Sequence, residues 1–414
     1  MDRVILHSDI NACYASIELL FAPKLRGKPM AVGGEEELRH GIVLSKTEEA
    51  KAAGVKTGMT IWEAKNRCPE LVVLPPRFDR YLYFTRQVQK IYADYTDRRE
   101  SFGIDESWLD LSGCIASRGG AETAREIGRR VKNELGLTVS VGVSWNKMFA
   151  KLGSDYKKPD AVTVIDREIY RELVWPLPAG ELLFVGRATT KRLAELGIRT
   201  IGELAAADPE TLRLRLGKCG VALHAAANGR DTSEVRRAGD FSPPKSIGNG
   251  TTPPRDMTSL AEAMPVIMSL AESVGARLRR AGVLARTITL ELRSADLSWR
   301  SHRMRPPCPT DCDRELLQTA LLLLAEAHRW PDALRGIAIR AEELLPLNAP
   351  AQLDVFTDYV NRDRQRRLDA AVDSLRRRYG GGAVRRGAVF ESPSMAVPVA
   401  QEEYAFVRKA EDFS

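Results

Sequence analysis

Two stretches far apart in the chain each place a carboxylate directly after a short apolar run. Asp9 follows Val4–Leu6 near the N-terminus, and Asp105 and Glu106 follow Ile104. Apolar runs of this kind are typical of buried strands, and strands that are distant in sequence can pair in one sheet. If these two strands are neighbours, the three carboxylates converge. Clustered carboxylates repel one another unless a cation lies between them, and Mg²⁺ prefers all-oxygen sites that substrate phosphates complete.

A cluster of this kind would suit a displacement at phosphorus. Two divalent ions held between carboxylates can stabilise both the attacking and the leaving oxygen of such a reaction. The alternative is that the Asp105-Glu106 dipeptide is solvated surface charge, which is where most acidic residues lie. The sequence around the two stretches decides between these interpretations.

The segments that must position the carboxylates alternate between strand-like and helix-like patterns. Apolar residues recur at helical spacing through residues 78–95, and residues 121–135 also have a helical pattern. Strand-like runs occupy residues 101–111, 137–143 and 162–165. The alternation predicts an α/β domain, and this domain lacks the glycine signature of a dinucleotide-binding fold.

The second half of the chain carries two further patterns. Residues 182–204 predict two short helices around glycine-containing turns, the first at Gly186, whose backbone N–H groups could hold a phosphate. Arg286–Arg293 alternates as a strand with one buried face does, and Arg300, Arg303 and Arg305 follow it. The alternatives are a plain turn in a helical bundle and a solvated strand face.

Several ordered motifs make the chain resemble the Y-family translesion DNA polymerases, in their DNA polymerase IV branch. Asp9, Tyr14, Ala15 and Glu18 match the register of the family's first acidic motif, and residues 103–110 reproduce its second. Further matches follow in order at residues 26–34, 54–59, 74–81, 142–147, 157–160 and 245–249. The resemblance covers roughly residues 1–380.

The resemblance implies a multi-domain α/β protein shaped as a right-hand polymerase, with an α/β palm, small fingers, a helical thumb and an α+β little finger. We expect the following parts: palm, 1–18 and 77–165; fingers, 19–76; helix-hairpin-helix thumb, 166–230; linker, 231–244; little finger, 245–345; C-terminal tail with a basic helix, 346–414.

The resemblance also implies an activity, which is template-directed transfer of a nucleotide from a deoxynucleoside triphosphate to a primer 3′-hydroxyl. Synthesis would be of low fidelity and would continue past damaged template. Asp9, Asp105 and Glu106 would hold two Mg²⁺ ions, with the Ile10 carbonyl as a backbone ligand. Asn11 stands where the family usually has a second Asp, a residue that is not normally a direct ligand.

The nucleotide would contact two further groups of residues. Tyr14 falls at the steric-gate position, where a ring excludes the 2′-hydroxyl of a ribonucleotide, although an aromatic after a strand can also be plain core. Ser45, Lys51 and Lys158 would bind the triphosphate. Glu48 departs from the family pattern here, and an acid beside a triphosphate is unfavourable.

Macromolecular partners follow from the same resemblance. Primer–template DNA would be held by Gly186 in the thumb and by Arg286, Arg300, Arg303 and Arg305 in the little finger. Gln352, Leu353, Val355 and Phe356 resemble the short peptides by which bacterial polymerases dock on the sliding clamp. The alternative is that this segment packs on the little finger. We expect a monomer.

Composition agrees with these expectations without proving them. The chain has 414 residues, which predicts several domains, and a net charge of +7 that weakly favours a polyanionic partner. The six cysteines show no paired framework or zinc spacing, and there is no signal-like or membrane-spanning segment. We therefore expect a cytoplasmic location. A rival hypothesis is a catalytically silent DNA-binding repair scaffold of the same fold.

Overall fold

The computed structural model describes residues 2–34, 41–114, 119–240, 243–349 and 358–387. These residues divide into two compact units, the first made of residues 2–34, 42–114 and 119–240 and the second of residues 243–349 and 358–387. None of the helices in these described ranges is long and apolar enough to cross a bilayer.

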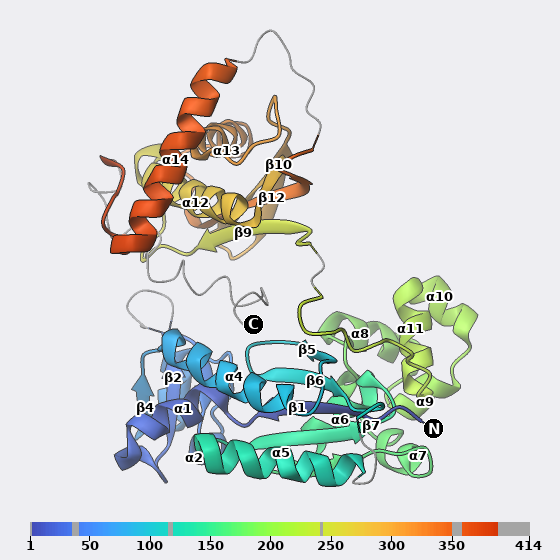
Figure 1. Ribbon diagram of the computed structural model, residues 1–414. Helices are drawn as coiled ribbons and strands as arrows, with labels where there is room; N and C mark the ends of the chain where they lie inside the picture. Colours follow the sequence, from blue (N-terminus) through green and yellow to red (C-terminus); the bar gives the residue numbers. More distant parts are fainter. Residues whose placement is uncertain (1, 35–40, 115–118, 241–242, 350–357, 388–414) are drawn as a thin grey trace. The chain divides into compact units, whose positions relative to one another are not determined.

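A five-stranded sheet forms the centre of the first unit (Figure 1). Its strands, in order across the sheet, are β5 (Arg99–Ser101), β6 (Glu106–Asp110), β1 (Ile5–Ile10), β7 (Val139–Ser144) and β8 (Val162–Val164). The central strand β1 is buried along its whole length and runs antiparallel to both neighbours. The strands that the sequence predicted around the carboxylates are therefore neighbours, as expected.

Helices cover both faces of this sheet. The helices are α4 (Phe78–Ala93) and α5 (Gly120–Leu135) on one face and α6 (Lys147–Tyr156) on the other. Leu6 and Leu109 share a core with α4 and α5, whereas Ile5 and Trp108 pack with Ala150 of α6. Because successive strand residues point to opposite faces, the odd-numbered residues of β1, including Asp9, face α6.

A small three-stranded sheet lies between β1 and α4 in the sequence. The elements of this segment, in chain order, are α1 (Cys13–Phe21), η1 (Pro23–Leu25), β2 (Met30–Gly33), β3 (Val43–Lys46), α2 (Glu48–Ala52), α3 (Ile61–Arg67) and β4 (Val72–Leu74). One face of the sheet has its own core with α2 and α3, whereas α1 and the other face of β2 pack into the core of the large sheet. Strand β2 is central, antiparallel to β3 and parallel to β4. This sheet places β3 and α2 beside the start of α1.

Short helices complete the first unit. They are α7 (Tyr170–Val174), η2 (Ala179–Glu181), α8 (Arg187–Glu195), α9 (Ile201–Ala206), α10 (Pro209–Leu216) and α11 (Lys218–Ala227). The segment that follows was predicted as a polar linker, but its first part packs on the edge of the large sheet. Val235 is buried, and the N–H of Ala238 donates to the Asp97 carbonyl at 2.9 Å.

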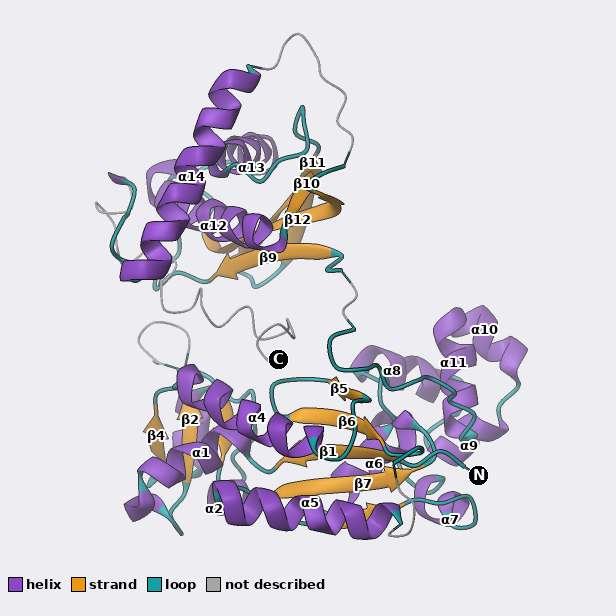
Figure 2. Ribbon diagram, viewed as in Figure 1, coloured by secondary structure: helices purple, strands orange, loops and turns teal. Residues whose placement is uncertain are grey.

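The second unit is a four-stranded antiparallel sheet covered by helices (Figure 2). Its strands, in order, are β11 (Trp299–Met304), β10 (Val283–Ser294), β12 (Leu334–Pro346) and β9 (Ser246–Thr251), and its helices are α12 (Leu260–Ala281), α13 (Asp313–Ala327) and α14 (Tyr359–Tyr379). The first two helices share the main core with β10 and β12.

Helix α14 confirms the basic helical segment that the sequence predicted, and it ends at Gly380. Some of its charged side chains pair with the rest of the unit, whereas others, such as Arg364 and Arg377, are exposed. Arg279 of α12 contacts Asp373 at 2.7 Å, and Arg376 of α14 contacts Glu272 of α12 at 2.8 Å. The helix is therefore anchored by ion pairs, which a sequence pattern of exposed charge does not reveal.

Candidate active site

The two acidic stretches meet across the pairing of β1 and β6. Asp9 lies directly opposite Glu106 in the antiparallel register, and the Ile10 N–H donates to the Asp105 carbonyl at 3.1 Å. Asp9 is buried, with 6% of its surface exposed. The pairing of β1 with β6 therefore brings Asp9, Asp105 and Glu106 together, as the sequence predicted.

The carboxylates line a pocket of about 330 Å³. The pocket lies between the end of β1, the start of α1 and the β3–α2 segment. Its lining residues are Asp9, Ile10, Ala12, Cys13, Tyr14, Leu44, Ser45, Lys46, Glu48, Lys51, Thr57, Asp105 and Glu106. The predicted metal ligands, steric gate and two of the predicted triphosphate residues thus share one cavity.

Two lysines from the α6 side pair with the carboxylates. The Nζ of Lys158 lies 2.6 Å from Asp9 Oδ2, and the Nζ of Lys151 lies 3.2 Å from Glu106 Oε1 and 3.6 Å from Asp9 Oδ2. Asp155 contacts both lysines, at 2.9 and 2.7 Å. The sequence reasoning named Lys158 but missed Lys151. Lys151 could have been found from its spacing to Asp155, because residues four apart on a helix lie on one face.

The reach of Lys151 depends on an unusually close approach of α6 to β7. A Cβ on Gly142 would collide with the Ala150 carbonyl and would lie 2.5 Å from the Ser154 nitrogen. Gly153 on the helix faces Gly142 on the strand, and a Cβ on Gly153 would lie 3.0 Å from the Gly142 Cα. Two glycines in contact therefore allow the helix backbone to lie on the sheet and bring Lys151 over β1 and β6.

Burial and neighbouring charges shift the pKa values of the three carboxylates in different directions. Burial raises the pKa of Asp9 to about 7 and outweighs the opposing ion pair with Lys158. Burial, with the charge of Glu106, also raises the pKa of Asp105. Burial acts in the same direction on Glu106, but His7 and Lys151 outweigh it and hold that pKa at about 2. Asp9 is buried and Asp105 and Glu106 are partly buried beside it, so an added cation would stabilise the charged forms of all three.

The donor chemistry fits a hard divalent cation. The available oxygens are those of Asp9, Asp105 and Glu106 and the backbone carbonyl of Ile10, and Mg²⁺ prefers such oxygen ligands. Over the described ranges no three His, Cys, Asp or Glu side chains are arranged ready to hold a metal. Lys151 and Lys158 meanwhile contact oxygens of Asp9 and Glu106, so ion binding would exchange lysine contacts for metal contacts.

Tyr14 is held in the first turn of α1 by aromatic neighbours. Its ring stacks on Tyr81, with centroids 4.3 Å apart and an angle of 8° between the planes, and meets Phe78 edge-on. The hydroxyl of Tyr81 donates to Glu18 at 2.9 Å, which fixes the supporting ring. The backbone before the helix is also constrained, because Ala12 has a left-handed φ of 45°. Tyr14 therefore presents a fixed ring to the pocket.

Asn11 points away from the carboxylates. Its side-chain amide donates to Thr138 Oγ1 at 3.1 Å and accepts from Ser140 Oγ at 2.7 Å. Both partners belong to the β7 side of the sheet. The replacement of the family's usual Asp by Asn therefore leaves the oxygens that face the pocket unchanged.

The opposite wall of the pocket is basic, and its one acid is paired. Ser45 accepts from the Ala15 N–H at 3.3 Å, and Lys46 donates to Thr57 at 3.2 Å. Lys51 lies 3.1 Å from Glu48, and the two side chains are equally exposed. Lys51 thus offsets the charge of Glu48, while Lys46 and Thr57 are lining residues that sequence reasoning did not assign.

The predicted DNA contacts lie in both units. Gly186 is the N-cap of α8, and no side chain caps the first N–H groups of that helix. Arg286, Arg300 and Arg303 are exposed on β10 and β11, and the nearby Arg305 pairs with Glu343 at 3.1 Å. The clamp-like segment, Gln352 to Phe356, lies outside the described residues.

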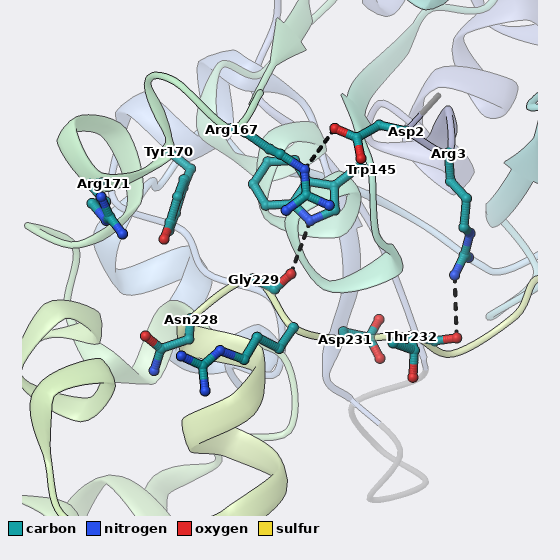
Figure 3. A pocket seen from close by; sticks show the side chains of 11 residues that line it. Asp2, Arg3, Trp145, Arg167, Tyr170, Arg171, Asn228, Gly229, Asp231 and Thr232 are labelled. Atoms are coloured by element: carbon teal, nitrogen blue, oxygen red, sulfur yellow. Dashed lines mark hydrogen bonds and ion pairs between the residues drawn. The ribbon is translucent and has the colours of Figure 1, made fainter.

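A second, larger pocket of about 590 Å³ lies in the same unit, between the start of the chain, α7 and the end of α11 (Figure 3). Arginines dominate its lining. Arg167 pairs with Asp2 at 2.6 Å and lies over the Trp145 ring, and Trp145 donates to the Gly229 carbonyl (Figure 3). Its two carboxylates, Asp2 and Asp231, are not among the acids that the sequence singled out, and all three of those acids line the smaller pocket.

Comparison with known proteins agrees with this geometry. Two models of the impB/mucB/samB family match the chain, one over residues 8–155 and one for the C-terminal domain over residues 244–355. The chain is 45% identical to a DNA polymerase IV of Acetivibrio thermocellus, over 94% of this chain and 98% of that protein. It is 39% identical to DNA polymerase IV 1 of Bacillus subtilis, over 94% of each.

A solved structure has the same fold. It is a Y-family DNA polymerase chimera, 23% identical, that superposes with a TM-score of 0.72 over 83% of this chain and 99% of the chimera. The predicted resemblance and fold class are thus confirmed. The chain belongs to the impB/mucB/samB family, within the DNA polymerase IV group of the Y-family polymerases.

Proposed function

We propose that this DNA-directed DNA polymerase performs translesion synthesis with Asp9, Asp105 and Glu106 as its catalytic carboxylates. The observation that carries the proposal is the pairing of Asp9 with Glu106 across β1 and β6, in a pocket that also contains Tyr14. The primer 3′-hydroxyl would attack the α-phosphate of a deoxynucleoside triphosphate opposite the template base, and pyrophosphate would leave.

Divalent metal dependence follows from family membership, and we infer two Mg²⁺ ions. Asp9, Asp105, Glu106 and the Ile10 carbonyl would hold them, and the ions would lower the pKa of the primer hydroxyl and stabilise charge on the triphosphate. Lys158 pairs with Asp9 in this structure. Once a cation neutralises that carboxylate, the Lys158 ammonium group could leave it and pair with a phosphate oxygen instead.

The remaining pocket residues would bind and select the nucleotide. Ser45 and Lys51 would donate to the triphosphate, and Lys46 would add a second positive charge on the same wall. The Tyr14 ring would lie under the sugar and leave no room for a 2′-hydroxyl. The wall of the pocket that faces the carboxylates comes from β3 and α2 of the small three-stranded sheet region, and both of these elements are short. That arrangement is consistent with tolerance of damaged template.

A catalytically silent repair scaffold is not favoured. Loss of a metal-binding carboxylate would mark such a protein, and all three are present here at one pocket. We retain it only as the outcome that the following test would reveal.

The test is Mg²⁺-dependent primer extension by Glu106→Gln. We expect at least a ~10²–10³-fold loss of rate, because removal of one charge-stabilising group commonly costs that much. Binding of primer–template, measured by fluorescence anisotropy, should be nearly unchanged. Glu134→Gln is the matched control, since Glu134 is exposed on α5 and pairs with Arg130 of the same helix, away from the pocket. Near-normal extension by Glu106→Gln would reject the assignment.

We also propose that the protein docks on a sliding clamp through residues 352–356 and acts in the cytoplasm, where a bacterial chromosome is copied. Leu353, Val355 and Phe356 would enter an apolar pocket of the clamp while Gln352 makes hydrogen bonds. Tethering would raise the effective concentration of polymerase at the primer end. Leu353→Ala/Phe356→Ala should abolish clamp-stimulated synthesis and leave clamp-free synthesis intact. A parallel loss of clamp-free activity would instead favour packing of this segment on the little finger.

A further inference from the structure

The turn that leads into α8 contains a strained aromatic residue. The N–H of Val185 donates to the carbonyl of Leu182 at 3.0 Å, which closes a four-residue turn, and Phe184 is its third residue with φ 71°. A positive φ at this position is the mark of a type II turn and is usually supplied by glycine, because a Cβ is disfavoured there. A bulky residue in this conformation costs free energy that glycine would avoid.

Packing of the Phe184 side chain does little to offset this backbone strain. Leu182 and Val185 on either side are buried in the helical core of the unit, whereas 66% of Phe184 is exposed. Among the described residues outside glycine, the others with positive φ are Ala12, Asp160, Leu297 and Glu343, so Phe184 is the only aromatic of that set. A ring that contributes little packing is held in a costly conformation. Strain of this kind is characteristic of functional positions.

The surroundings of Phe184 are suited to a nucleic-acid backbone. The next residue but one, Gly186, caps α8 without a side-chain hydrogen bond, so the first N–H groups of this nine-residue helix are available to an anion. Arg187, Lys191 and Arg192 are exposed on the same helix, and none has an ion pair in the part of the chain that the structure describes. Phosphate-binding chemistry therefore lies directly beside an exposed apolar ring.

We propose that Phe184 packs against the deoxyribose of the duplex, next to the phosphate bound at the start of α8. This inference rests on the proposed DNA contact of Gly186 and adds an apolar, sequence-independent contact to it. The sugar is the apolar part of a nucleic-acid backbone, and a ring that covers it removes apolar surface of both partners from water. Because no phosphate is neutralised by the ring, its contribution to binding should not depend on salt.

The test measures the Kd of the full-length protein for a labelled primer–template duplex at several salt concentrations. Phe184→Gly and Phe184→Ala should each weaken binding about tenfold, near the lower end of what burial of an aromatic ring provides. The slope of log Kd against log salt should equal that of the wild type in both variants. Phe184→Tyr keeps the ring and should restore the affinity. Leu214→Ala, which removes a side chain that is 77% exposed on α10 of the same helical region, is the matched control and should bind normally.

Thermal stability separates the contact from a folding defect. Phe184→Gly relieves the positive φ, so its Tm should equal or exceed that of the wild type even though it binds DNA less well. If Phe184→Ala lost affinity and Phe184→Gly did not, the loss would come from backbone strain at this position and not from the missing ring. That result would overturn the proposal. Equal affinity of all variants, with Arg187→Ala still flattening the salt slope, would reject the ring contact alone. Failure of the wild type to bind primer–template would reject the proposed function itself.

Discussion

The Tyr14 ring is positioned by three successive contacts, and this makes its role open to a sharp test. It stacks on Tyr81, Tyr81 donates to Glu18, and Glu18 also pairs with Arg80 at 3.0 Å. A ring held in this way cannot move aside when a larger sugar enters the pocket. Discrimination against ribonucleotides would then come from a clash with the wrong substrate, not from an added attraction to the right one.

Tyr14→Ala should therefore admit ribonucleotides and leave deoxynucleotide incorporation in place. We expect the ratio of deoxy- to ribonucleotide kcat/KM to fall by at least tenfold, because steric exclusion of a single group commonly accounts for that much selectivity. Single-nucleotide kinetics on a primed template measure it. Tyr14→Phe retains the ring and loses only the hydroxyl, so it should discriminate as the wild type does. An unchanged ratio in Tyr14→Ala would reject the steric gate.

At the scale of elements, the distance between α6 and β7 controls which charges lie beside the carboxylates of the candidate active site. Because Gly142 and Gly153 touch, the helix lies close enough for Lys151 to reach Asp9 and Glu106. A methyl group on Gly142 would have to occupy the place of the Ala150 carbonyl, which is backbone and cannot rotate away. The helix would move as a body and take Lys151 with it.

Gly142→Ala should lower the free energy of unfolding by ~1–3 kcal/mol or more, as overpacking of a tight core does. It should also reduce primer extension. Gly128→Ala on α5 is the matched control, because its new Cβ would meet only Val139 at 3.9 Å and a helix-interior alanine is favoured over glycine by roughly 0.5–1 kcal/mol. Urea unfolding and extension assays on both variants give the comparison. Equal stability of the two would contradict the packing argument.

The local sequence pattern predicted the individual strands and helices, because apolar spacing within one segment determines them. Strand β1 and helices α4 and α5 follow from apolar periodicity. Asp9 meets Glu106 because the end of β1 pairs antiparallel with the start of β6, where Glu106 is the first residue. Lys151 was missed because its reach depends on contact between two glycines that are distant from the carboxylates in sequence. The anchoring of α14 was missed because a helix whose charges face inward to partners such as Glu272 has the same sequence pattern as a solvated one.

At the scale of the whole molecule, the excess of positive charge is spread over surfaces that can be told apart by experiment. Arg300, Arg303 and Arg305 lie on or just after the edge strand β11, and Arg364, Arg377 and Arg378 are exposed on α14. Both sets carry the same charge. If net charge alone attracts DNA, either set should matter equally, whereas direct phosphate contact should make only one of them important.

Replacement of Arg300, Arg303 and Arg305 by Ala should flatten the salt dependence of primer–template binding. Each phosphate contact releases counterions and contributes roughly −0.9 to the log–log slope on B-form DNA, so the slope should shrink by about that amount for each arginine that touches a phosphate. Affinity should fall uniformly across DNA sequences, because phosphate contacts carry no base information. The matched triple variant on α14 removes the same charge and should keep the wild-type slope. Equal slopes in the two triple variants would mean that β11 does not contact the backbone, and that the protein is drawn to DNA by its overall charge alone.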